Sequence, residues 1–183
     1  MRIPAGIRSE IDRIVSLIGL PGCGKSAIGQ ELARRLDLPF FDCDRAIESR
    51  AGCTIASLFE HEGEAAFRER EATMLASLVG EGPSVIATGG GAVLRSDNRD
   101  LLRTRTVCVF LDAGHDLLWK RLRRDRRRPL LQVADPQARL RELSAERDPL
   151  YRETAHIVVK SDGMPFGRLV DEVARRIAED TVR

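Results

Sequence analysis

Short apolar runs alternate with longer helix-like segments along the whole chain. The apolar runs contain many β-branched residues and cover residues 14–18, 39–41, 84–87, 106–111 and 156–159. The segments with helical periodicity between them cover residues 25–36, 64–79, 97–102, 113–122, 136–147 and 165–177. Strands that alternate with helices in this way form a parallel sheet covered on both faces. The sequence therefore predicts an α/β fold of three layers around a central parallel five-stranded sheet.

Length and composition limit the classes of protein that the chain can belong to. The 183 residues fit one domain, and a net charge of +2 argues against a general nucleic-acid binder. No stretch approaches the roughly 18 apolar residues of a membrane span, and the first residues lack the apolar segment of a secretory signal. The four cysteines show no zinc-ligand spacing and no disulfide framework. We therefore expect a cytoplasmic protein with no nucleic-acid or membrane partner.

The most specific motif follows the first apolar run directly. Residues 19–26 read Gly-Leu-Pro-Gly-Cys-Gly-Lys-Ser, the phosphate-loop pattern G-x-x-x-x-G-K-S between a strand and a helix. Its glycines let consecutive backbone N–H groups point at a phosphate, and the helix adds the positive end of its dipole. Lys25 is expected to reach the outer phosphates, and the Ser26 hydroxyl is expected to bind Mg²⁺. The sequence thus predicts that the chain binds a nucleoside triphosphate.

Two carboxylates follow the second apolar run. Asp42 and Asp44 would point the same way if the strand continued through both. At the carboxyl end of a strand beside the phosphate loop, one could hold Mg²⁺ through water and the other could accept a proton from an attacking hydroxyl. The alternative is that Asp44 only caps a helix over residues 45–50. The pattern alone leaves both interpretations open.

Arg68 and a run of three glycines are the next candidates for a substrate site. Arg68 follows Phe67 on a predicted helix, so its guanidinium could clamp a substrate carboxylate, although a solvated face of ion pairs is the ordinary interpretation of such charges. The third apolar run leads into Gly89, Gly90 and Gly91. Consecutive glycines suit a place where a ligand approaches the backbone, and a flexible loop is the alternative.

Residues 121–131 contain many arginines and are interrupted by Pro129. In isolation such a run could bind RNA. In a phosphate-loop protein it is better explained as a mobile lid, here residues 123–135, whose closure would bring Arg128 to the transferring phosphoryl group. Arg147, near the predicted end of the following helix, could be a second carboxylate ligand or an ordinary charge at a helix end.

In combination, these motifs resemble the shikimate kinase family. The resemblance covers residues 14–177 and rests on six motifs in the family's order: the phosphate loop, Asp42-x-Asp44, Phe67-Arg68-x-x-Glu71, Gly89-Gly90-Gly91, Arg128-Pro129-Leu130-Leu131 and Glu146-Arg147-x-Pro149-Leu150-Tyr151. It implies a P-loop kinase fold with a substrate-binding helical insert, residues 44–80, and a lid. It also implies a monomer that phosphorylates the 3-hydroxyl of shikimate with ATP and Mg²⁺, in aromatic amino-acid biosynthesis.

The resemblance also implies roles for individual residues. Lys25 and Arg128 would stabilise the phosphoryl charge, and Asp44 would be the base. Ser26 would bind the metal directly and Asp42 through water. The substrate would be bound by Asp44, Arg68, Gly89, Gly90, Gly91 and Arg147. The nucleotide would be bound by Gly22, Cys23, Gly24, Lys25, Ser26, Ala27, Arg121, Arg128 and Pro165.

Two alternatives of different kinds remain. A related small-molecule kinase, for example one that acts on gluconate, would share the phosphate loop but should lack the combination of Arg68, Arg147 and the three glycines. A nucleotide-dependent RNA binder would need aromatic residues beside the arginine run. Only Trp119 lies near that run in the sequence, at a spacing that favours packing within a helix.

Overall fold

The computed structural model describes residues 13–123 and 133–181. Its centre is a parallel sheet of five strands in the order β2-β3-β1-β4-β5. The strands are Val15–Ile18 (β1), Phe40–Asp42 (β2), Val85–Ala87 (β3), Val107–Asp112 (β4) and Ile157–Lys160 (β5). The expected α/β class and the five strands are confirmed. Because all strands run the same way, the loops that follow β1, β2 and β3 meet at one edge of the sheet.

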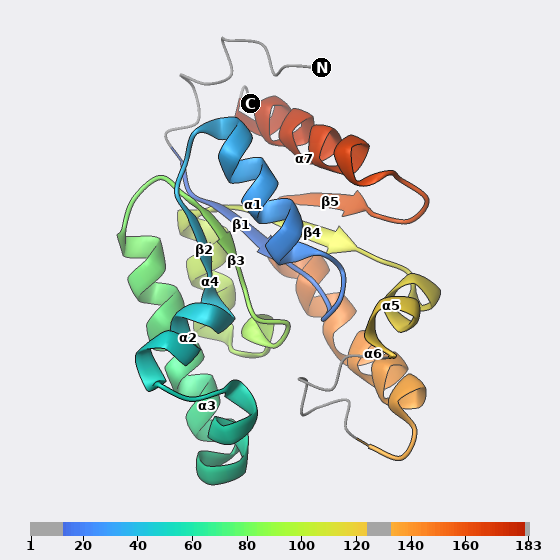
Figure 1. The fold of residues 1–183 in the computed structure, drawn as a ribbon. Coiled ribbons are helices and arrows are strands. Elements are labelled where there is room, and N and C mark those ends of the chain that lie inside the picture. The colour runs from blue at the N-terminus through green and yellow to red at the C-terminus, as the bar shows by residue number, and fades with distance from the viewer. Residues whose placement is uncertain (1–12, 124–132, 182–183) are drawn as a thin grey trace.

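Helices cover both faces of the sheet (Figure 1). In that view α1 and α7 lie on one face, whereas α4 and α6 lie on the other. The helical elements are Lys25–Leu36 (α1), Cys43–Ala51 (α2), Ile55–Gly80 (α3), Ala92–Leu94 (η2), Ser96–Arg105 (α4), His115–Leu122 (α5), Pro136–Thr154 (α6) and Phe166–Thr181 (α7). Within the described ranges, no helix is long and apolar enough to cross a membrane.

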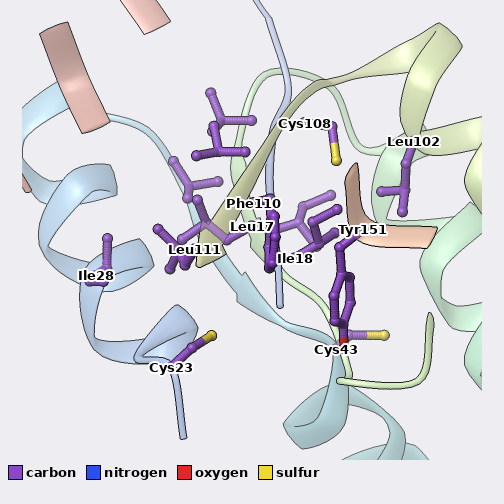
Figure 2. Packing of buried hydrophobic residues seen from close by; sticks show 14 of the residues in the cluster. Leu17, Ile18, Cys23, Ile28, Cys43, Leu102, Cys108, Phe110, Leu111 and Tyr151 are labelled. Carbon is purple, nitrogen blue, oxygen red and sulfur yellow. The ribbon is translucent and has the colours of Figure 1, made fainter. Parts of the chain in front are cut away.

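The core lies between the sheet and its helices. Leu17 and Ile18 of β1 pack near Phe110 and Leu111 of β4 (Figure 2), and none of these four side chains is more than 1% exposed. Burial of each such side chain contributes about 1.5–3 kcal/mol. The buried hydroxyl of Ser16 is paired with that of Thr106, at 2.6 Å. The central strands therefore form a rigid support for the loops at their carboxyl ends.

Helix α6 ends later than the sequence pattern indicates. We expected it to end at Arg147, because Pro149 lacks a backbone N–H and normally breaks a helix. The helix instead continues through Pro149 to Thr154. Tyr151 and Thr154, in the added turn, are at most 1% exposed. Their packing stabilises the helix beyond the proline, and the interpretation of Arg147 as a charge at a helix end is wrong.

The predicted insert corresponds to α2 and α3, which pack against each other and extend beyond the β2 edge of the sheet (Figure 1). Gly63 has non-helical dihedral angles (φ 79°, ψ 172°), so α3 is two helical segments separated by a break. The predicted lid, residues 123–135, falls mostly outside the described part of the chain. Arg128 itself lies there, and its proposed role remains a prediction.

Candidate active site at the carboxyl edge of the sheet

The phosphate loop connects β1 to α1. Gly22 and Gly24 have φ angles of 83° and 106°, a region that residues with a Cβ atom rarely adopt. Helix α1 begins at Lys25, and Gly24 before it provides no side-chain cap. The first N–H groups of the helix therefore keep their capacity to bind an anion.

Lys25 is held against its own loop. Its Nζ donates hydrogen bonds to the carbonyl oxygens of Gly19 at 2.7 Å and Leu20 at 3.1 Å. The residue is only 9% exposed. A phosphate bound in the loop would compete with these carbonyl oxygens for the ammonium group.

Asp42 links the phosphate loop to α2. The Ser26 hydroxyl donates to Asp42 Oδ2 at 2.6 Å, and Asp42 Oδ1 accepts the backbone N–H of Arg45 at 3.2 Å. Asp42 is therefore the residue that caps α2, and the alternative that Asp44 provides the cap is wrong. Asp44 lies in the first turn of that helix, so β2 ends at Asp42. The condition for the two carboxylates to point the same way, a strand that continues through both residues, is therefore not met.

A cleft of about 390 Å³ opens over the phosphate loop. It brings together most of the residues expected to bind the nucleotide, and Asp44 and Gly90 of the expected substrate set. Arg121 lies on its wall and donates from NH1 to the Gly22 carbonyl oxygen at 3.0 Å. Pro165 lies between two lining residues, Met164 and Phe166. Phe166 is 51% exposed, and the sequence interpretation did not include it.

Arg68 projects from α3 into a buried position beside the glycine loop. It is only 9% exposed, so a solvated face does not describe it, although it does form ion pairs with Glu64 and Glu71 at 2.8 Å each. Its guanidinium also lies over the rings of Phe59 and Phe67, at 5.9 and 5.3 Å from their centroids. Salt bridges and aromatic rings thus fix its orientation.

The three glycines are required by close approaches rather than by flexibility. A Cβ atom on Gly89 would lie 2.2 Å from Glu71 Oε1, and one on Gly91 would lie 2.3 Å from Arg68 NH1. A Cβ atom on Gly90 would lie 2.9 Å from the Cδ of Pro21 in the phosphate loop. The absence of Cβ atoms therefore lets the glycine loop lie close to the phosphate loop and to the Arg68 region.

Glu71 is a site residue that the sequence interpretation quoted in a motif but gave no role. It is 1% exposed, and within the described residues its Oε1 has no hydrogen-bond partner. Burial raises the pKa of Glu71, against the opposing effect of Arg68. The spacing of three residues from Arg68 on one helix was the signal that could have identified it.

Arg147 and Tyr151 reach the same loop from α6. Arg147 donates from NH1 to the Gly90 carbonyl oxygen at 3.1 Å, and the Tyr151 hydroxyl donates to that same oxygen. Arg147 is 2% exposed, and its Nε has no partner among the residues described. Of the ion pairs found between described residues, none includes Arg147. Its charge is therefore not compensated by an ion pair with any described residue, although the buried carboxylate of Glu71 interacts with it electrostatically.

The parallel sheet, the phosphate loop and the cleft above it define a P-loop phosphotransferase that acts on small molecules. The family model described as shikimate kinase matches residues 21–180. The chain belongs to the shikimate kinase family.

Individual relatives agree with this assignment. A shikimate kinase of Ralstonia nicotianae is 49% identical over 163 residues, which cover 89% of this chain and 86% of the relative. A shikimate kinase of Acinetobacter baumannii, solved in complex with shikimate, superposes with a TM-score of 0.91 at 38% identity, covering 95% of this chain and 97% of that one. A gluconokinase of Sinorhizobium meliloti, at 18% identity, a TM-score of 0.54 and coverage of 93% and 95%, shares the fold alone.

Proposed function

We propose that the protein transfers the γ-phosphoryl group of ATP to the 3-hydroxyl of shikimate and releases ADP and shikimate 3-phosphate. The observation that carries this proposal, beyond family membership, is the buried guanidinium of Arg147 beside the phosphate-loop cleft, which forms no ion pair with any described residue and whose Nε has no hydrogen-bond partner among them. A substrate with a carboxylate would supply the missing anion, and a hydroxyl on the same molecule could then face the γ-phosphate.

The carboxylate would be held by Arg147 and Arg68. Two guanidinium groups from different helices, α6 and α3, contact the glycine loop: Arg147 donates to the Gly90 carbonyl oxygen, and Arg68 NH1 lies where a Cβ atom on Gly91 would come within 2.3 Å of it. Bidentate hydrogen bonds from arginine orient a planar carboxylate as well as attracting it. This arrangement would fix the ring of the substrate and aim one hydroxyl at the phosphate loop.

Asp44 is proposed as the base. It lines the same cleft as the phosphate loop and lies close to Gly89, where an added Cβ atom would be 2.9 Å from its Oδ1. Its carboxylate would accept the proton of the 3-hydroxyl as the oxygen attacks the γ-phosphorus and the bond to the ADP oxygen breaks. Lys25, with Arg128 from the lid, would stabilise the charge on the transferred group.

The nucleotide would be held by the phosphate loop and the nearby cleft wall. Backbone N–H groups from Gly22, Cys23, Gly24, Lys25, Ser26 and Ala27 suit the phosphates. Arg121 and Pro165 would flank the adenine ring of the nucleotide. The Ser26 hydroxyl and Asp42 Oδ2, 2.6 Å apart, are oxygen donors of the kind that Mg²⁺ prefers, so the pair fits a metal bound directly by Ser26 and through water by Asp42. When bound, Mg²⁺ would neutralise part of the phosphate charge.

We also propose a cellular location, an oligomeric state and a domain organisation for the protein. The four cysteines are free thiols, which supports a reducing cytoplasm. We further propose a monomer that forms one domain over residues 1–183, with residues 44–80 as the substrate-binding insert and residues 123–135 as the lid. It needs no nucleic acid or membrane partner for its reaction.

The deciding experiment is a coupled ADP-release assay with shikimate, with gluconate and without an acceptor. We expect turnover with shikimate that stops when Mg²⁺ is chelated. ADP release that responds to gluconate and ignores shikimate would overturn the proposal in favour of a sugar-acid kinase. Turnover that is unchanged by either acceptor would indicate an ATPase.

The two arginines of the carboxylate site make a separate prediction. Arg68→Lys and Arg147→Lys should each weaken shikimate binding about tenfold or more, because lysine keeps the charge but loses hydrogen bonds worth ~1.5–3 kcal/mol. ATP binding should not change. Calorimetric titration with each ligand separately measures both effects. Arg139→Lys is the matched control, since Arg139 lies on α6 but pairs with Glu142 away from the cleft. Equal weakening for both ligands would mean that the arginines support only the fold.

A further inference from the structure

One backbone oxygen joins α6 to the glycine loop. The carbonyl oxygen of Gly90 accepts hydrogen bonds from Arg147 NH1 at 3.1 Å and from the Tyr151 hydroxyl. Arg147 and Tyr151 are four residues apart, so they lie on one face of α6. We propose that Tyr151 is a positioning residue for the carboxylate site, whose hydroxyl holds the Gly90 carbonyl where Arg147 can present its guanidinium to the substrate. This inference rests on the proposed function.

The ring of Tyr151 has a fixed place. It is 0% exposed and is stacked on Phe110 of β4, with the ring centroids 5.0 Å apart and an interplanar angle of 25° (Figure 2). Burial raises the pKa of Tyr151, so the hydroxyl keeps its proton and remains a donor. A buried hydroxyl needs a hydrogen-bond partner, and the packed ring of Tyr151 cannot shift. The hydrogen bond from Tyr151 therefore fixes the position of the Gly90 carbonyl relative to the core.

Arg147 depends on that carbonyl more than a surface arginine would. Its Nε has no hydrogen-bond partner among the described residues, and its NH1 donates to the Gly90 carbonyl oxygen at 3.1 Å. On its other side, Gly90 lies against Pro21 of the phosphate loop, where a Cβ atom would come within 2.9 Å. A small displacement of Gly90 would therefore move the anchor of Arg147 relative to the phosphate loop.

The test is Tyr151→Phe, which keeps the ring and removes only the hydroxyl. We expect KM for shikimate to rise about fivefold, as for the loss of one hydrogen bond, with kcat and KM for ATP changed less than about twofold. The matched control is Thr154→Val. Its buried hydroxyl, also on α6, donates to the Leu150 carbonyl oxygen at 2.6 Å, so its loss should affect stability but not KM. A wild-type enzyme that requires shikimate, combined with an unchanged KM in Tyr151→Phe, would overturn this inference and leave the proposed function intact.

A double-mutant cycle tests whether Tyr151 acts through Arg147. In an Arg147→Lys background, Tyr151→Phe should no longer weaken shikimate binding measured by calorimetry. A fivefold loss that persists there would show that the hydroxyl does not act through the arginine.

A spectroscopic readout keeps the Tyr151 side chain in place and so does not depend on the stability of Tyr151→Phe. Tyr151 is the single tyrosine of the chain, so growth with 3-fluorotyrosine labels one site. Its ¹⁹F resonance should shift when shikimate saturates the wild-type protein, and the shift should be smaller in Arg147→Lys when shikimate saturates that variant. A resonance that ignores shikimate in the wild-type protein would contradict the inference.

Discussion

Replacing Asp44 by asparagine is expected to slow phosphoryl transfer about 10²–10⁴-fold, the contribution of a well-placed general base. Asparagine keeps the shape of the side chain but cannot accept the proton of the attacking hydroxyl. ATP binding should persist, because the phosphate loop contacts the nucleotide independently of Asp44. Single-turnover measurements with saturating ATP and shikimate would separate the transfer step from binding.

The control for this variant must remove the same charge from an equivalent helix position. Asp116→Asn does so, since Asp116 lies exposed in the first turn of α5, as Asp44 lies in the first turn of α2. Its rate should equal that of the wild type. If Asp44→Asn keeps a rate within a few fold of wild type, Asp44 is not the base and contributes only favourable charge at a helix N-terminus.

Lys25→Ala should lower kcat by about 10²-fold or more, with a smaller change in KM for ATP. The ammonium group stabilises charge that develops on the transferred group, and alanine has nothing to replace it. The chain contains only three lysines, Lys25, Lys120 and Lys160, so the matched substitution Lys120→Ala on α5 is a simple control. Steady-state kinetics of both variants would measure the difference.

A structural contribution of Lys25 must be separated from the catalytic one. The substitution also removes the donor to the Gly19 and Leu20 carbonyl oxygens. Thermal unfolding of the ATP-free protein would report that loss. The catalytic role would be contradicted if kcat of Lys25→Ala fell no more than kcat of Lys120→Ala while the unfolding midpoint dropped strongly. Lys25 would then stabilise the loop and not the transition state.

Sequence patterns predicted the elements that local rules determine. The phosphate loop and the bounds of α1, Lys25–Leu36, followed from glycine spacing and helical periodicity alone. The end of α6 did not, because packing of Tyr151 in the core outweighs the local effect of Pro149. The alternative that Asp44 caps the helix, which the pattern left open, is wrong for a similar reason, since Asp42 suits a cap equally well and only the end of β2 decides between the two residues.

The sequence motifs could not predict the contacts between segments that are distant in the chain. Gly89 and Gly91 could be read as a flexible loop until their approach to Glu71 and Arg68 was known. The buried state of Arg147 likewise depends on β4, the glycine loop and α6 coming together, and charge patterning along one segment contains no information about it. The motifs predicted which residues form the site, whereas the contacts between these residues follow from tertiary structure.

The buried guanidinium of Arg147, whose Nε has no partner among the described residues, links the thermal stability of the protein to the concentration of its substrate. A buried cation that has no ion pair among the described residues lowers the free energy of unfolding of the empty protein. An anionic substrate relieves that strain as it binds, in addition to the ordinary stabilisation by a ligand. Selection for heat resistance of the empty protein would therefore favour uncharged residues at position 147. The selected variants would be more stable, and we expect them to bind the substrate poorly.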